Sequence, residues 1–507
     1  MVDVGRTGPP VVDPTSSLNT LKETLADPAS YLLGERFGGV ILPSFDKEYY
    51  GVPPLKRHVF ASSSEIRLQT HGFDPLFSYA QGGLAQAWTA GCYPFTDAEL
   101  SDFPFDPATL HAGYNEVGRR IGVTGDRDDL TPFLPWHEGI LPPLPLDEHS
   151  RVLLQVYERH RTRMHTRLRC VVGRTRVATL TSPQGDRQAC AHLGRCLWGC
   201  PVGALYTPDA TLRECLTYEN FSYRDGLRAE WFTVGTGGTV ESLIVTHLTD
   251  DTRERMPIDQ LVLAAGALST SRIYLRSVYH HTGTLARLTG LMDNRQVLVP
   301  FLNLRMVGKP FAPDTYQYHL LGLGITSDDP RGYIHGQITT LKTALLHPII
   351  QKLPVDLRTA TFLTRHLHAA LGVVNLNLAD TRRDTNVLTL DDPDAPLPTL
   401  DIQYRPPTDE RDHLRAALRT LRRGLRTLGC LVPPGMTHVR PMGASVHYAG
   451  TIPMQRDRAP HTTNPNGRSH DYPNLVLADG ATFPFLPAKN LTFTLMANAV
   501  RIVRAEF

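Results

Sequence analysis

Three cysteines stand close together along the chain and are followed by a proline, in the run Cys190-Ala-His-Leu-Gly-Arg-Cys196-Leu-Trp-Gly-Cys200-Pro201. The spacing is that of a four-cysteine ferredoxin run in which Leu193 stands where the second cysteine would be. Thiolates are soft ligands that suit iron, and three of them suit a three-iron cluster better than a four-iron one. A zinc ion would need a fourth ligand, for which the run offers only His192, and a turn without metal is the other alternative. The candidate metal ligands are Cys190, Cys196 and Cys200.

A second group of polar side chains lies near the C-terminus. His447 opens the run His447-Tyr-Ala-Gly-Thr-Ile-Pro-Met454, and Asp479-Gly480 closes a short apolar run. Asn490 stands just before a final Ala-containing helix pattern. Taken in this order, the runs resemble the C-terminal signature of the glucose–methanol–choline (GMC) flavoprotein oxidoreductases.

Two earlier runs agree with this resemblance. Leu261-Val-Leu-Ala-Ala-Gly-Ala-Leu-Ser-Thr-Ser-Arg272 looks like the family's second flavin-adenine contact strand. Gly82-Gly83-Leu-Ala-Gln-Ala-Trp88 looks like the glycine pair that packs under the flavin. Each run is short, but their order along the chain is the family's order, so the chain is identified as a GMC relative.

The resemblance implies a role for His447 and for Asn490. Oxidation of an alcohol needs a base for the hydroxyl proton and an acceptor for the hydride, and a neutral histidine and the N5 atom of oxidised flavin can serve. By the resemblance His447 is the base, and Asn490 takes the place of the second His or Asn that hydrogen-bonds the substrate oxygen. The plain alternatives are a structural histidine and an Asx turn after Pro487.

The resemblance also implies which residues contact FAD. Asp479-Gly480 looks like the pair that meets the ribityl–pyrophosphate region, although the same dipeptide is common in turns at strand ends. Asp3 falls where the acidic residue that binds the adenosine ribose should be. The expected cofactor-binding residues are Asp3, Gly82, Gly83, Gly266, Asp479 and Gly480.

The cysteine run resembles the dehydrogenase branch of the same family, in which three thiolates hold a three-iron cluster beside the flavin. We therefore expect FAD as the cofactor, and the three thiolates are candidate ligands of a 3Fe-4S cluster, with a cysteine-rich turn that holds no iron as the open alternative. This favours a dehydrogenase over an oxidase, with electrons leaving to an unknown external acceptor.

One family element is missing from this sequence. The family should begin with a strand, a G-x-G-x-x-G turn and a helix that holds the flavin pyrophosphate. Gly235-Thr-Gly237-Gly238 is the Gly-x-Gly candidate, but no helix pattern follows it and it predicts a hairpin turn. Met1–Gly5 instead resembles the second strand of the fold, so the chain begins about 30 residues later than the fold requires. A misplaced start codon is the favoured explanation, ahead of a second polypeptide or a decaying copy.

The elements that must position these residues can be predicted in outline. Leu261–Gly266 is a short apolar run typical of a buried parallel strand, and a helix pattern follows it. Residues 296–405 contain strand candidates with period-two alternation, which favours an antiparallel sheet. An amphipathic helix is expected over 408–429, with its arginines on a solvated face and Gly429 after its end. The strand candidates start at Val297, Tyr316, Tyr333 and Val373, and residues 101–150 are expected to form long loops with short helices.

We therefore expect an α/β (α+β) fold of two lobes. A Rossmann-like FAD domain would comprise residues 1–295, with the chain returning to it over 441–507. A mostly antiparallel substrate domain would comprise residues 296–440.

Composition excludes several functional classes. The 507 residues carry 52 Lys+Arg against 50 Asp+Glu, and this balance gives no reason to expect nucleic acid as a partner. No apolar run is long enough to span a bilayer, and Met1–Arg6 does not open a signal peptide, so we expect a cytoplasmic protein. The expected activity is oxidation of a CH–OH group of a small-molecule alcohol or sugar. The alternative is a non-catalytic or partner-dependent remnant of the fold that cannot hold FAD alone.

Overall fold

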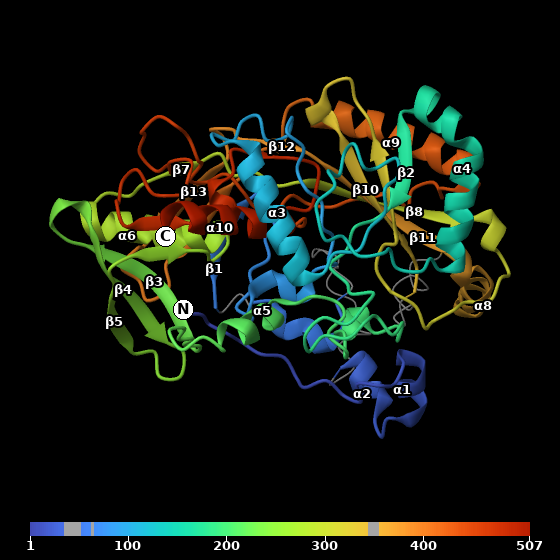
Figure 1. Cartoon of the computed structure of the whole chain (residues 1–507), viewed down its shortest axis with the longest axis horizontal. Helices are drawn as coiled ribbons and strands as arrows, with labels where there is room; N and C mark the ends of the chain where they lie inside the picture. Colours follow the sequence, from blue (N-terminus) through green and yellow to red (C-terminus); the bar gives the residue numbers. More distant parts are fainter. Residues whose placement is uncertain (35–51, 62–64, 343–353) are drawn as a thin grey trace.

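The structure, a computed structural model, describes residues 1–34, 52–61, 65–342 and 354–507. The expected fold class is confirmed, because helices and several sheets are packed together in a mixed α/β arrangement (Figure 1). Within the described residues, no helix combines the length and the apolar character that crossing a membrane requires.

A seven-stranded sheet, at the right of Figure 1, contains the antiparallel strands expected from residues 296–405. One side of it is covered by α4 (Glu148–Leu168) and α9 (Glu410–Thr427), which bury alternate apolar side chains of the strands. The helix predicted over 408–429 is confirmed as α9, and Gly429 follows its end with a positive φ. In spatial order the strands are β15 (Cys430–Leu431), β8 (Arg295–Asn303), β11 (Leu371–Leu378), β10 (Ile334–Thr340), β9 (Leu321–Ile325) and β2 (Cys170–Arg174), with β16 (His438–Val439) also on β8.

Two details of this sheet differ from expectation. The sheet includes β2, and α4 packs on it, although both elements come from before residue 296. The strand expected from Tyr316 begins only at Leu321, because residues 316–320 are irregular and pack on the cysteine turn instead. There Gln317 accepts a hydrogen bond from the Leu197 amide, and Tyr318 donates one to the Cys196 carbonyl.

The other large buried cluster surrounds α6 (Ala267–Thr282), at the left of Figure 1. The predicted strand, glycine turn and helix are confirmed, since β6 (Leu261–Leu263) leads through Gly266 into α6 and pairs in parallel with β17 (Leu475–Leu477). The predicted hairpin turn at 235–238 joins β3 to β4. The remaining strands here are β3 (Leu227–Val234), β4 (Val240–His247) and β5 (Arg253–Pro257) in one sheet, and β1 (Arg67–His71), β14 (Thr399–Gln403), β13 (Val387–Asp391) and β7 (Leu288–Thr289) in another.

Between these clusters, α3 (Pro107–Ile121) packs against the C-terminal helix α10 (Thr492–Glu506). The expectation of only short helices over 101–150 was wrong at α3. Asp106 caps this helix, Pro107 opens it, and its apolar residues recur at helical spacing on the face toward α10. The smaller elements are α1 (Leu18–Thr24), α2 (Pro28–Leu33), α5 (Pro208–Cys215), α8 (Leu357–Leu367), β12 (Asp380–Thr381) and β18 (Phe485–Leu486).

Candidate active site

His447 lies buried in a loop outside the helices and strands, and a hydrogen bond holds its ring in one orientation. Its Nδ1 atom is 2.9 Å from Oδ1 of Asn294, and the Asn294 amide nitrogen donates to the carbonyls of Leu378 (2.8 Å) and Pro487 (2.9 Å). Because those two bonds occupy the amide nitrogen, the Asn294 oxygen faces the imidazole and Nδ1 must carry the proton. Nε2 is therefore the nitrogen that can accept a proton. Burial, with a contribution from Arg440, lowers the pKa of His447 to about 4, so the ring is neutral at neutral pH.

The loop that carries His447 is held by Asp293. The Asp293 carboxylate accepts a bond from the Gly443 amide at 2.6 Å and another from the Ser445 hydroxyl, and Ser445 Oγ accepts from the His447 amide at 3.0 Å. Gly443 has φ +93°, and a Cβ there would stand 2.6 Å from the backbone of Asp74. Asp293 is fully buried, and this raises its pKa to about 7. Consecutive residues 293 and 294 thus fix the loop and the ring of the same histidine.

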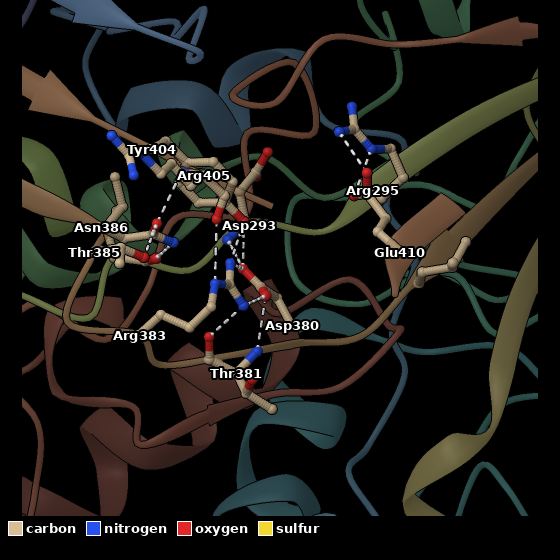
Figure 2. A network of polar contacts seen from close by, with 12 residues as sticks. Asp293, Arg295, Asp380, Thr381, Arg383, Thr385, Asn386, Tyr404, Arg405 and Glu410 are labelled. Carbon is tan, nitrogen blue, oxygen red and sulfur yellow. Dashed lines mark hydrogen bonds and ion pairs between the residues drawn. The ribbon is translucent and has the colours of Figure 1, made fainter. Parts of the chain in front are cut away.

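Figure 2 shows how Asp293 is tied into a wider polar network. Its amide donates to the Asp380 carboxylate at 3.0 Å. Asp380 also accepts from the Tyr404 hydroxyl at 2.5 Å and from Arg383 at 2.5 Å. Nearby, Arg295 pairs with Glu410 of α9. The start of β8 is therefore anchored to β12, to Tyr404 just after β14, and to α9.

Asn490, the second expected catalytic residue, lies beside the seven-stranded sheet. Its Oδ1 atom accepts a bond of 3.0 Å from Nε2 of Gln337 on β10, which leaves its own amide nitrogen as the group able to donate. The preceding residue, Lys489, is fully buried and pairs with Glu99 at 2.6 Å. Asn294 bonds both the His447 ring and the Pro487 carbonyl, so the structure joins the two candidate catalytic segments through one side chain.

Three of the expected cofactor-binding residues lie together at the start of α6. The Asp479 carboxylate accepts from the Gly266 amide (2.9 Å), the Thr270 hydroxyl (2.5 Å) and the Ala481 amide (2.9 Å). Burial raises the pKa of Asp479. A Cβ on Gly480 would stand 2.6 Å from the Tyr448 carbonyl, so this glycine allows the close approach of the His447 loop.

The other three expected cofactor-binding residues form a separate group. The Asp3 carboxylate accepts from the Tyr223 hydroxyl at 3.2 Å and lies against the backbone amide of Gly82, and burial raises its pKa. A Cβ on Gly82 would stand 2.4 Å from Pro208, so packing alone requires glycine there. Gly83 has a positive φ and open space where a Cβ would be.

The geometry of these groups fits a dinucleotide cofactor. Gly83 and Gly266 both have left-handed φ values, and a Cβ at either would meet no atom within 4 Å, which is what close approach of a ligand to the backbone requires. Gly266 also directly precedes the first turn of α6, where its amide donates to the Asp479 carboxylate. These residues would hold FAD, and Asp479 would orient the turn around Gly266.

Cys190, Cys196 and Cys200 are partly buried free thiols within the segment 190–200. Burial raises the pKa of Cys196, and the neighbouring Cys200 and Cys190 add to this shift. Nevertheless, the part of the chain that the structure describes contains no group of three or more His, Cys, Asp or Glu side chains placed to hold a metal ion. The expected 3Fe-4S cluster at Cys190, Cys196 and Cys200 therefore has no support in the structure.

A cavity of about 350 Å³ opens close to the His447 loop. Neither His447 nor Asn490 lines it, so it is not the place where we expect the reaction. Its lining residues are Asp102, Thr381, Arg382, Pro453, Met454, Gln455, Pro484 and Phe485.

Sequence reasoning missed Asp293, Asn294 and Gln337. The available signal was the adjacent polar pair Asp293-Asn294 directly before an apolar strand run. On its own such a pair is typical of a turn, and only the tertiary structure shows that both side chains face the His447 loop.

Comparison with known proteins shows which proteins the chain resembles. A family model described as GMC oxidoreductase matches residues 382–499, which include His447 and Asn490. The chain is 26% identical over 470 residues to paromamine 6'-oxidase of Streptomyces fradiae, covering 88% of this chain and 77% of that protein. It is 26% identical to C-glycoside 3-oxidase of Microbacterium trichothecenolyticum, covering 87% of this chain and 78% of that protein.

Solved structures share the fold. Pyridoxine 4-oxidase from Mesorbium loti superposes with a TM-score of 0.58 at 16% identity, covering 100% of this chain and 93% of that one. A formate oxidase superposes with a TM-score of 0.60 at 10% identity, with the same coverage of both chains.

Proposed function

We propose, since the chain belongs to the GMC oxidoreductases, that it oxidises a CH–OH group of a small-molecule alcohol or sugar with FAD as cofactor. The observation that carries the proposal is the His447 ring, which Asn294 orients with a neutral Nε2 atom able to accept a proton. Two relatives are named as oxidases of sugar-containing molecules, which supports a hydroxyl group as the point of attack.

The chain's own residues would act as follows. Nε2 of His447 takes the hydroxyl proton of the substrate, and the amide of Asn490 donates a hydrogen bond to the substrate oxygen. Asp293 and Asn294 keep the histidine in place without contacting the substrate. FAD, when bound, supplies the acceptor for the hydride.

The electron acceptor divides an oxidase from a dehydrogenase. The expectation of a dehydrogenase rests on the cysteine run as a cluster site. Among the described residues no group of side chains is placed to hold a metal, so the cysteine run no longer favours a dehydrogenase. The similar proteins with curated names are named as oxidases. Oxygen consumption during turnover, compared with reduction of a dye under argon, separates the two activities.

The test first measures whether the purified full chain shows the absorbance of bound flavin at about 450 nm. Anaerobic addition of alcohols and sugars should bleach this band, and His447→Ala should slow the bleaching about 10²–10⁴-fold while bound flavin stays unchanged. His413→Ala, on the exposed face of α9, is the matched control and should behave as the parent. A colourless chain would favour the alternative of a non-catalytic or partner-dependent remnant, and unchanged bleaching in His447→Ala would exclude this base.

A further inference from the structure

Exposed apolar side chains gather beside the seven-stranded sheet, in three segments around α8 and β15. Among the described residues, eighteen large apolar side chains are exposed, and eight of them stand in the segments 304–309, 355–367 and 422–439. Their exposed fractions run from 40% to 73%. The eight are Leu304, Val307, Val355, Leu357, Phe362, Leu431, Met436 and Val439.

Backbone contacts join the three segments into one surface. The Gly308 amide donates to the His366 carbonyl of α8 at 3.0 Å, and the Leu304 amide donates to the Gly429 carbonyl at 3.3 Å. β15 directly follows Gly429 and pairs with β8. α8 stands at the right-hand end of the molecule in Figure 1. We call the exposed side chains of these three segments the α8 patch.

The charged side chains of the α8 patch are nearly all basic. The three segments contain seven Lys or Arg and one acidic residue, whereas the whole chain is balanced at 52 against 50. The acidic residue, Asp356, is used at the N-terminus of α8, where it accepts from the Thr359 amide at 3.0 Å. The basic residues are Arg305, Lys309, Arg358, Arg365, Arg422, Arg423 and Arg426, all of them exposed.

The helix α8 shows how the two kinds of side chain are combined. It buries Ala360 and Thr364 and leaves Phe362 exposed. Arg358 stands four residues before Phe362 and Arg365 three residues after it, so both arginines flank the ring on one face of the helix. Such a mixture is typical of elements that lie at a bilayer surface, because the ring enters the apolar layer while the basic groups stay at the lipid phosphates.

The charge of the α8 patch decides between the occupants that could cover its apolar side chains. A second copy of the chain would bring the same basic groups toward each other across a twofold axis, which is repulsive. A bilayer of neutral lipids would use the apolar side chains but offer no counter-charge to the arginines. A membrane that contains anionic lipids satisfies both kinds of side chain.

We propose that the α8 patch binds the surface of a membrane that contains anionic phospholipids. Phe362 and its apolar neighbours lie in the headgroup region, and the arginines pair with lipid phosphates. The binding is peripheral and reversible. It goes beyond the proposed oxidation, since the patch contains none of the candidate catalytic or cofactor-binding residues, and its test needs no turnover.

The first experiment measures flotation of the full chain with two kinds of vesicle. One kind is phosphatidylcholine with about 30% phosphatidylserine, and the other is phosphatidylcholine alone. We expect at least about 10-fold tighter binding to the anionic vesicles, and weaker binding when the salt is raised from about 50 to about 500 mM. Equal binding to both kinds, or binding to neither, would overturn the proposal.

The second experiment reverses two charges of the α8 patch. Arg358→Glu combined with Arg365→Glu should lower the affinity for the anionic vesicles at least about 10-fold. Its matched control, Arg456→Glu combined with Arg458→Glu, changes the net charge equally at two exposed arginines outside the patch. The control should stay within about twofold of the parent, because charges beyond a Debye length from the bilayer are screened. Equal losses in the two proteins would show that net charge alone attracts the chain, and the α8 patch would not be the site.

The third experiment tests the apolar part of the α8 patch. Phe362 is 60% exposed, and Tyr218, outside the patch, is 57% exposed and serves as the control. Phe362→Gln should weaken vesicle binding about 3–10-fold and Tyr218→Gln less than about twofold, while both proteins keep the Tm of the parent because neither ring is buried.

Two further results would assign the α8 patch to another occupant. If Phe362→Gln binds vesicles like the parent and poly-glutamate binds as tightly as the vesicles do, the patch fits an acidic protein and the membrane proposal fails. If sedimentation velocity shows a dimer of the full chain that Phe362→Gln dissociates, a second copy covers the patch and the proposal fails as well.

Discussion

At the scale of single residues, Asn294 determines what His447 can do. Its oxygen fixes the proton on Nδ1, while its amide nitrogen donates to the carbonyls of Leu378 and Pro487. A positioning residue of this kind acts only through the group it positions, and this makes its effect separable from general damage to the fold.

We predict that Asn294→Ala slows flavin reduction about 10–100-fold, the equivalent of one lost buried hydrogen bond at 1–3 kcal/mol. The same substitution in a His447→Ala background should have almost no further effect on the rate, because the group it orients is gone. Rapid-mixing measurements of the rate of flavin reduction in the parent, the two single variants and the double variant form a double-mutant cycle. Additive losses would show that Asn294 acts independently of His447.

The depressed pKa of His447 gives a second prediction. The imidazole is the base only when neutral, so flavin reduction should be constant across neutral pH and should fall as the pH drops through about 4. Stopped-flow rates of flavin reduction between pH 3.5 and 8, in buffers of equal ionic strength, measure this acid-side fall of the rate. If the rate instead falls with a midpoint near the ordinary histidine pKa of about 6.5, the ring is more solvated than the structure shows.

The sequence offered candidate site residues only where polar residues cluster in recognisable runs. His447, Asn490 and Asp479 lie in runs whose order is informative on its own. Asn294 and Gln337 are far from those runs, and they reach the site because β8 and β10 bring them there. Nothing local distinguishes them from the other polar residues at strand positions.

At the scale of elements, Lys489 fixes the segment that leads into α10. Its ammonium group is fully buried, pairs with Glu99 at 2.6 Å, and donates to the carbonyls of Pro94 and Phe133. Burial lowers the pKa of Lys489, and the Glu99 carboxylate opposes that shift. The adjacent Asn490 is therefore presented by a segment that is anchored on three sides.

We predict that Lys489→Met lowers the free energy of unfolding by about 3–5 kcal/mol, because it leaves the Glu99 carboxylate buried and unpaired. Adding Glu99→Leu should recover a large part of the loss, since no charge is then left inside. Urea denaturation of the parent, the single variant and the double variant measures both steps. A double variant less stable than Lys489→Met would contradict the assignment of the loss to an unpaired charge.

Element prediction succeeded where periodicity was simple. The alternation along β8, β10 and β11 and the leucine spacing of α9 were visible in the sequence. It failed at residues 316–320, which are all buried without forming a strand, so their apolar character mimics a buried strand. It also failed at α3, where turn-forming residues on both sides concealed a helix that is opened by Asp106 and Pro107.

At the scale of the whole molecule, Asp293 makes stability depend on pH. Its pKa is raised from the model-peptide value near about 3.9 to about 7, so the folded state binds a proton that the unfolded state releases. Its contribution is therefore complete below about pH 4 and is lost as the pH rises to about 7. At about 1.4 kcal/mol for each pKa unit, the loss is at most about 4 kcal/mol.

We predict that Asp293→Asn removes this part of the pH dependence. The free energy of unfolding of the parent, measured by urea denaturation, should fall relative to that of the variant between pH 4 and 7. Parallel curves for the two proteins over this range would show that Asp293 stays ionised. Asp401→Asn, at a residue of β14 outside the Asp293 network, serves as the control for loss of a carboxylate.

The pairing of α10 with α3 has a consequence for how the protein is made. Gly113 of α3 meets the Ala497 carbonyl so closely that a Cβ there would stand 2.4 Å away, and the Tyr114 hydroxyl bonds that of Thr494 at 2.7 Å. These contacts join residues almost four hundred positions apart. The pairing of β6 with β17 likewise joins two segments that are far apart in the sequence. During synthesis, the side of α3 that meets α10 and the edge of β6 that pairs with β17 lack these partners until residues 475–506 have been made, and such unpaired surfaces are prone to aggregate. Yield in the cell should therefore depend on chaperones that hold nascent chains, more than on the stability of the finished fold.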